Sequence, residues 1–114
     1  MELSVVIPVK NEAENIAPLV AEIHAALDPL TDFEIVYVDD GSADDTVARI
    51  RVLQATDPAL RLVRHAASCG QSTAVRSGVK AARGRWIATL DGDGQNDPAD
   101  IPTLWRLAGA DEPA

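Results

Sequence analysis

The stretch FEIVYVDDGS, residues 33–42, decides the fold of this chain. Residues 33–38 are almost continuously apolar, which is typical of a central parallel strand that is buried on both faces. The strand runs directly into Asp39-Asp40-Gly41-Ser42, where two acidic residues precede a turn. A buried strand that ends in such a polar loop predicts an open α/β sheet with functional groups at its carboxyl edge.

Outward from this stretch, short apolar runs alternate with segments of helical period, the pattern of a parallel sheet covered by helices. Right-handed crossovers predict the strand order 3-2-1-4. The predicted fold class is therefore α/β, a Rossmann-like three-layer α/β/α parallel sheet, and the 114 residues are expected to form one domain. We expect the other strands at 3–9, 60–64 and 86–90, and helices from about 14 to 27, 44 to 55 and 70 to 82, with a last short helix that carries Trp105.

Three local features predict how the helices begin, end and pack. Pro18 is expected in the first turn of its helix, which places the helix start near residue 14 or 15. Gly84 is expected to end the third helix, and Val79 of that helix is expected to face inward.

Composition excludes several classes of function. A net charge of −8 without a basic stripe repels phosphate backbones, so no nucleic-acid partner is expected. The apolar runs are far shorter than the roughly 20 residues that span a bilayer, which favours a soluble, cytoplasmic protein. Cys69 is the single cysteine and is interpreted as a small loop residue rather than a catalytic partner of His65. Because the two histidines are far apart in the sequence, no zinc site is expected.

Polar clusters follow three of the expected strands. Residues 8–12 follow the first strand, Asp39 and Asp40 follow the second, and residues 91–95 follow the fourth. In open α/β sheets, ligands bind beyond the carboxyl ends of the strands where the strand order reverses. The three loops are therefore expected to converge on one crevice.

The last of these clusters is a candidate metal site. Asp91 and Asp93 can face one ion because Gly92 and Gly94 give the loop freedom to curl, and Gln95 adds a neutral carbonyl oxygen. Ligands that are all oxygen suit Mg²⁺ or Mn²⁺, with nucleotide phosphates completing an octahedron. Such an ion would neutralise charge on a leaving diphosphate. An Asp-rich turn without any ligand is the alternative.

The acidic pair after the second strand also has two interpretations. Asp40 or Ser42 caps the following helix, with Gly41 making the turn. In the functional interpretation, one carboxylate of the Asp39-Asp40 pair caps the helix and the other reaches a ribose hydroxyl or a base. Spacing alone leaves both open.

Three segments occur in order at the expected strand ends: SVVIPVKNEAENI at 4–16, VDDGS at 38–42 and LDGDGQNDP at 90–98. Together they resemble family 2 glycosyltransferases of the GT-A fold, most of all the dolichol-phosphate mannose synthase group and its bacterial polyprenyl-phosphate relatives. The resemblance implies inverting transfer of a hexose from a GDP-sugar or UDP-sugar to a polyprenyl phosphate. Since the catalytic domains of that family are longer, the chain is expected to be a truncated GT-A nucleotide-binding half.

The same resemblance implies roles for individual residues. It assigns no general base and no other catalytic residue to this chain. It also implies that a polyprenyl phosphate is bound only where an acceptor half is supplied, at the cytoplasmic face of a membrane. The implied nucleotide-binding residues are Pro8, Val9, Glu12, Asp39, Asp40, Gly70, Gln71 and Asp91, and the implied metal ligands are Asp91, Asp93 and Gln95.

Two further functions stay open at this point. One is a nucleotide-binding or regulatory module without turnover. The other is a phosphate-accepting receiver-like domain, which is disfavoured because its paired acids would follow the first strand. Independently, the apolar strand expected at 86–90 has a free edge, which predicts a homo-oligomer through edge-to-edge pairing or exchange of the last helix.

Overall fold

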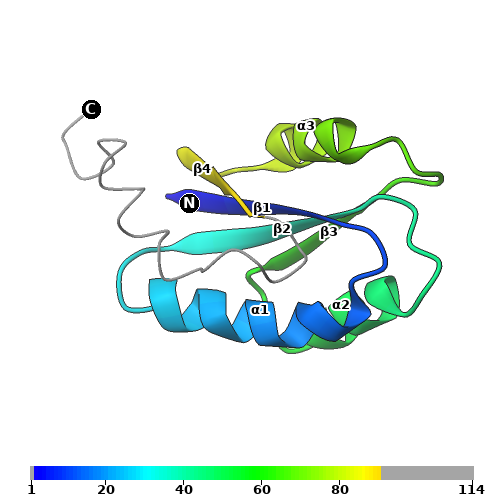
Figure 1. Cartoon of the computed structure of the whole chain (residues 1–114). Coiled ribbons are helices and arrows are strands. Elements are labelled where there is room, and N and C mark those ends of the chain that lie inside the picture. The colour runs from blue at the N-terminus through cyan, green and yellow to red at the C-terminus, as the bar shows by residue number, and fades with distance from the viewer. Residues whose placement is uncertain (1, 91–114) are drawn as a thin grey trace.

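The computed structural model describes residues 2–90, which form a four-stranded parallel sheet with helices on both faces (Figure 1). The strand order is β3-β2-β1-β4, so the predicted order is confirmed. The predicted last helix falls in 91–114 and lies outside the described residues. The strands are β1 (Leu3–Val9), β2 (Phe33–Asp39), β3 (Leu60–Arg64) and β4 (Trp86–Thr89), and the helices are α1 (Ala13–Leu27), α2 (Thr46–Gln54) and α3 (Gln71–Ala81).

Two apolar layers hold the helices on the sheet. α1 and α2 cover one face and α3 covers the other, which confirms the three-layer arrangement (Figure 1). Because successive strand side chains point to opposite faces, Val5 and Ile7 of β1 join the larger core under α1 and α2, whereas Val6 joins the smaller core under α3. None of the helices described combines the length and the apolar character that a bilayer crossing requires.

The local predictions for α1 and α3 were wrong in three details. α1 begins at Ala13, so Pro18 lies in its second turn. Proline has no N–H to donate to the carbonyl oxygen of Glu14, but both residues are exposed, so water can take that place. Val79 is 41% exposed rather than inward. Gly84 does not end α3 in a left-handed conformation, since the positive-φ glycines among the described residues are Gly41 and Gly70.

Gly84 is required for a different reason. A Cβ atom at this position would lie 2.5 Å from the backbone nitrogen of Ser4. Gly78 has a similar function in α3, because a Cβ there would lie 2.4 Å from Cγ1 of Val6. Both glycines therefore bring α3 and the following segment close to β1.

A buried polar network fixes this close approach. Glu34 of β2, with 1% of its surface exposed, accepts hydrogen bonds from Oγ of Ser4 at 2.5 Å, the backbone N–H of Arg83 at 2.6 Å and Nη1 of Arg61 at 2.9 Å. Oγ of Ser4 in turn accepts the N–H of Gly84 at 2.7 Å. Burial by itself raises the pKa of Glu34, but these hydrogen bonds and the charge of Arg61 outweigh it and lower the pKa. The network joins β1, β2, β3 and the segment after α3.

β4 pairs with β1 through the register Leu3↔Trp86 to Val6↔Thr89. Within residues 2–90 it has no second strand neighbour. The homo-oligomer through this edge stays a prediction.

His24 of α1 makes the stability of this fold depend on pH. Its Nδ1 lies 2.9 Å from Oδ1 of Asp28 and its Nε2 lies 2.6 Å from Oδ2 of Asp57. Burial lowers the pKa of His24, but the hydrogen bonds and charges of these two carboxylates outweigh it and raise the pKa above 6.5. The imidazolium therefore stabilises the fold fully below the unfolded pKa, and this contribution is lost as the pH rises through the raised folded pKa.

We expect His24→Gln to be more destabilising at about pH 6 than at about pH 8.5. Urea unfolding of both proteins at both pH values measures the difference, and comparison with wild type removes the contributions of all other titrating groups. An equal loss of stability at the two pH values would contradict the interpretation.

Candidate functional site

The loops after β1, β2 and β3 meet at the carboxyl edge of the sheet and are tied to one another. Asn11, in a left-handed conformation with φ of 56°, donates its N–H to Oγ of Ser42 at 2.9 Å and accepts the N–H of Ala43 on Oδ1 at 2.8 Å. The N–H of Glu12 donates to Oγ1 of Thr46 at 2.9 Å. The first two loops are therefore held in one arrangement before any ligand binds.

At the start of α2, the N-cap residue Asp45 makes no side-chain capping hydrogen bond, and its neighbour Asp44, which neither sequence interpretation named, binds the first helical residue. Oδ1 of Asp44 accepts hydrogen bonds from the backbone N–H of Thr46 at 2.9 Å and from its hydroxyl. The hydroxyl hydrogen bond is the largest cause of the lowered pKa of Asp44. The prediction that Asp40 or Ser42 caps this helix was wrong, because both side chains are occupied by other loops.

Asp40 instead holds the loop between β3 and α3. Its Oδ1 accepts the N–H of Cys69 at 2.8 Å and faces Nδ1 of His65 at 2.8 Å. Its Oδ2 accepts the N–H of Gly70 at 2.9 Å and the hydroxyl of Ser68 at 3.0 Å. The N–H of Cys69 and the imidazole of His65 are the main reasons why the pKa of Asp40 lies far below its usual value. Asp40 is thus a buried, fully hydrogen-bonded anion that shapes the loop.

His65 extends this arrangement to α3. Its Nε2 lies 2.9 Å from Oγ of Ser77. Because the carboxylate of Asp40 can only accept, Nδ1 carries a proton, and in the neutral imidazole Ser77 then donates to Nε2. The three side chains have the order of a catalytic triad, but the N–H groups of Cys69 and Gly70 already bind Asp40 and offer no oxyanion site. The chain of contacts is structural.

Asp39 differs from Asp40 in the hydrogen bonding of its carboxylate. Only 1% of its surface is exposed, and its Oδ2 accepts the N–H of Ser42 at 3.3 Å. Its Oδ1 is buried and has no hydrogen-bond partner among the described residues. Asp39 lines a cavity of about 390 Å³ together with Gly41, Ser42, Arg64, His65 and Ala66.

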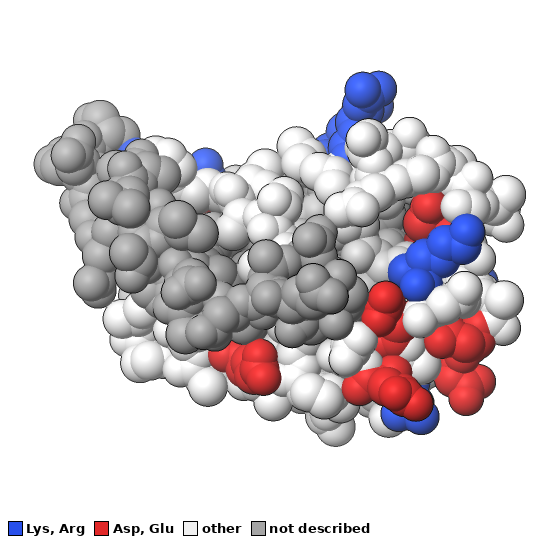
Figure 2. All heavy atoms as spheres, viewed as in Figure 1, with Lys and Arg blue, Asp and Glu red and all other residues white. Residues whose placement is uncertain are grey.

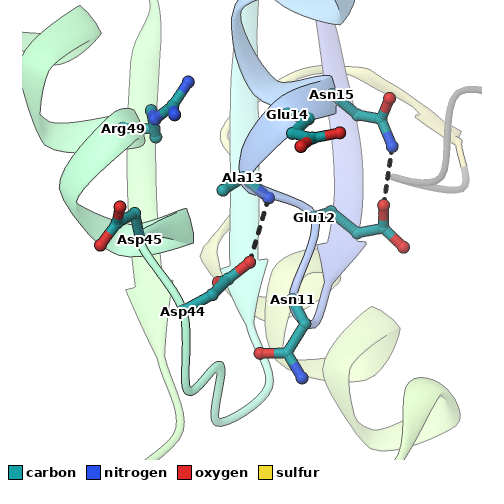
Figure 3. Close-up of a pocket in the computed structure, with 8 residues that line it drawn as sticks. All are labelled: Asn11, Glu12, Ala13, Glu14, Asn15, Asp44, Asp45 and Arg49. Atoms are coloured by element: carbon teal, nitrogen blue, oxygen red, sulfur yellow. Dashed lines mark hydrogen bonds between the residues drawn. The ribbon is translucent and has the colours of Figure 1, made fainter.

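A second cavity, of about 350 Å³, lies beside the start of α1 and α2 (Figure 3). Figure 2 shows acidic side chains gathered at this end of the molecule. Such a lining repels phosphate groups, so the Asp39 cavity suits a nucleotide better. The second cavity is lined by Asn11, Glu12, Ala13, Glu14, Asn15, Asp44, Asp45 and Arg49.

The structure brings some of the predicted site residues together and separates others. Asp40 binds the loop after β3 at the N–H of Gly70, and Asp39 lines the cavity beside this loop. Glu12 instead lines the second cavity, where its side chain accepts a hydrogen bond from Nδ2 of Asn15 at 2.7 Å. Pro8 and Val9 are buried in β1, and Gln71 is exposed at the start of α3. The predicted metal ligands Asp91, Asp93 and Gln95 lie outside the described residues.

Sequence reasoning missed three contributors to this region: Arg64, His65 and Ser77. Arg64 ends β3 and His65 directly follows it. The rule that ligands bind beyond the carboxyl ends of strands, which selected the other loops, therefore also points to these two residues. Ser77 gave no signal, because a serine inside a helix is usually a solvated residue.

A parallel sheet in the order β3-β2-β1-β4, with its loops tied together at the carboxyl edge, defines an open α/β fold of the Rossmann-like class. The chain belongs to glycosyl transferase family 2, which matches residues 4–114. Dodecaprenyl-phosphate galacturonate synthase of Rhizobium johnstonii is 43% identical over 106 residues, which are 91% of this chain and 31% of that protein. The chain thus spans about a third of the length of the curated relatives it matches.

Two solved structures show the same fold. The mannosyltransferase PcManGT from Pyrobaculum calidifontis, in complex with GDP-Man and Mn²⁺, aligns with a TM-score of 0.77 and 29% identity over 87% of this chain and 29% of that chain. TarS of S. aureus, in complex with UDP-GlcNAc, aligns with a TM-score of 0.77 and 25% identity over 96% of this chain and 30% of that chain. The predicted GT-A fold class is therefore confirmed.

Proposed function

We propose that this chain binds the nucleoside of a GDP-sugar or UDP-sugar beside Asp39, as the donor-binding part of an enzyme that transfers a hexose to a polyprenyl phosphate. Membership of glycosyl transferase family 2 supports the reaction class. The name of the Rhizobium johnstonii relative supports a polyprenyl phosphate as acceptor. The complexes of PcManGT with GDP-Man and of TarS with UDP-GlcNAc support a nucleotide sugar as donor.

The observation that carries the proposal is Oδ1 of Asp39, a buried oxygen with no hydrogen-bond partner within residues 2–90. A buried acceptor without a donor destabilises a fold by about 1–3 kcal/mol, and more when it is charged. Guanine, uracil and ribose all present N–H or O–H donors, so a bound nucleoside would satisfy this oxygen. The adjoining cavity of about 390 Å³ is within the range of small-molecule sites.

The positive charge beside the cavity supports binding of a nucleotide, whose phosphates are anionic. Arg64 lines the cavity and supplies a positive charge that attracts an anion. We further propose that Asp91, Asp93 and Gln95 hold Mg²⁺ or Mn²⁺, because carboxylate and amide oxygens are the ligands these ions prefer. When bound, the ion would neutralise negative charge on the leaving diphosphate.

Asp39→Asn tests the proposal through two opposite effects. We expect GDP or UDP, titrated calorimetrically with Mn²⁺ present, to bind about 10- to 100-fold more weakly, because a hydrogen bond to a charged group contributes about 1.5–3 kcal/mol. The unliganded variant should be at least as stable to urea as wild type, because an unpaired buried charge is removed.

Asp45→Asn is the matched control, since Asp45 is exposed at the start of α2 and makes no side-chain capping hydrogen bond. Its nucleotide affinity and stability should equal those of wild type. Unchanged affinity in Asp39→Asn would reject the site. Nucleotide binding without sugar transfer or sugar-nucleotide hydrolysis, by a chain supplied with its acceptor half, would favour the alternative of a binding module without turnover.

A further inference from the structure

The loop after β3 places a sulfur, a nitrogen and an oxygen ligand atom at one point. The ligand atoms of Asp40, His65 and Cys69 all lie within 4.8 Å of one another. The side chains of Asp40 and His65 are only 7% and 13% exposed, whereas Cys69 is exposed. The sequence predicted no zinc site because the histidines are far apart, but the fold supplies one histidine with two other ligands.

We propose that this cluster is a Zn²⁺ site, distinct in its residues and its chemistry from the proposed diphosphate metal. Zn²⁺ is held in proteins by thiolate, imidazole and carboxylate groups, and three such ligands with a fourth open position are a common arrangement. Mg²⁺ and Mn²⁺ favour oxygen ligands and gain little from a thiolate or an imidazole. The ligand set therefore selects a softer ion than the one expected at Asp91 and Asp93.

The ion takes the position of a proton. Nδ1 of His65 and Oδ1 of Asp40 are 2.8 Å apart and share the imidazole proton. In a tetrahedral zinc site, two such ligand atoms lie roughly 3.4 Å apart, so a small outward movement of the side chains admits the ion. Sγ of Cys69 now donates to the carbonyl oxygen of Ala67 at 3.3 Å. On binding, the thiol proton passes to solvent, the imidazole proton moves from Nδ1 to Nε2, and Zn–N, Zn–O and Zn–S bonds form as the ion gives up bound water.

The groups around the ligands are already arranged for this exchange. With Zn²⁺ on Nδ1, the imidazole proton lies on Nε2, and Oγ of Ser77 at 2.9 Å changes from donor to acceptor. Oδ2 of Asp40 keeps its hydrogen bonds from Ser68 and from the N–H of Gly70. Zinc-binding histidines usually donate their second N–H in this way, and ligating carboxylates are usually hydrogen-bonded as well.

Titration of the nucleotide-free chain with Zn²⁺ against a chromophoric chelator tests the site without reference to the proposed function. We expect one Zn²⁺ per chain, no competition from Mg²⁺, and release of the Cys69 thiol proton on binding. Co²⁺ should occupy the same site and give a thiolate-to-cobalt charge-transfer absorption, which requires a cysteine ligand.

Variants assign the ligands. Cys69→Ser should abolish the charge-transfer absorption and weaken Zn²⁺ binding by more than about 100-fold, and it should fold normally because Cys69 is exposed. Ser77→Ala should weaken binding by about 10- to 100-fold while keeping the absorption. His24→Gln is the matched control, because His24 also lies between two carboxylates, and it should bind Zn²⁺ like wild type.

Three results would overturn the proposal: no Zn²⁺ binding by the folded chain, equal binding by wild type and Cys69→Ser, or loss of binding in His24→Gln. Loss of nucleotide binding in Asp39→Asn with intact Zn²⁺ binding would leave both proposals standing as separate sites.

Discussion

Asp40→Ala is expected to lower the free energy of unfolding by about 3–5 kcal/mol, a large share of the stability of a small domain. The carboxylate is the common acceptor for the N–H groups of Cys69 and Gly70, the hydroxyl of Ser68 and the imidazole of His65. Alanine removes the buried carboxylate that these four groups share, so the loop loses the acceptor that holds it. The loop between β3 and α3 should therefore lose its conformation before the sheet unfolds.

Urea unfolding measures the loss of stability, and amide hydrogen exchange at Cys69 and Gly70 measures the opening of the loop. Asp45→Ala is the matched control, because this carboxylate is exposed and makes no side-chain capping hydrogen bond. The interpretation of Asp40 is rejected if Asp40→Ala stays within about 0.5 kcal/mol of wild type, as a surface substitution does.

Glu34→Ala is expected to have an effect of similar size, about 3–5 kcal/mol, at the opposite end of the strands. It leaves Ser4, the N–H of Arg83 and the guanidinium of Arg61 without their shared acceptor. Arg61 keeps its hydrogen bond to the carbonyl oxygen of Ala81, at 2.7 Å. The close passage of Gly84 over Ser4 should loosen, since the carboxylate orients both segments.

A double-mutant cycle of Glu34→Leu and Arg61→Met measures the free energy of interaction between Glu34 and Arg61, apart from their other contacts. Because a buried ion pair is often no more stabilising than apolar side chains of similar volume, Glu34→Leu with Arg61→Met should recover part of the loss seen in Glu34→Leu alone. Thermal and urea unfolding of the four proteins give the coupling free energy. Additive losses would show that the two side chains act independently.

The arrangement of strands could be predicted from the sequence because it depends on local apolar patterns. β2 is nearly continuous in apolar residues and is buried at every position, and β3 begins and ends where it was expected. Helix ends were less accurate, since α1 accommodates Pro18 in its second turn and the N–H of Thr46, at the start of α2, donates to Asp44 rather than to Asp40 or Ser42. Those details depend on which loop donates to which side chain, and that is set by residues distant in the sequence.

The sequence by itself determined the sheet order, the layers and the edge at which polar loops gather, because the period of apolar residues and the hand of crossovers are local properties. Only the tertiary structure distinguished Asp39 from Asp40. Adjacent residues at the end of a strand point in different directions. One carboxylate is therefore saturated by a loop that begins 25 residues later, whereas the other lines a cavity and has a buried oxygen without a partner in the described part of the chain. The same folding brought His65 and Cys69 to Asp40, a meeting that spacing along the chain does not reveal.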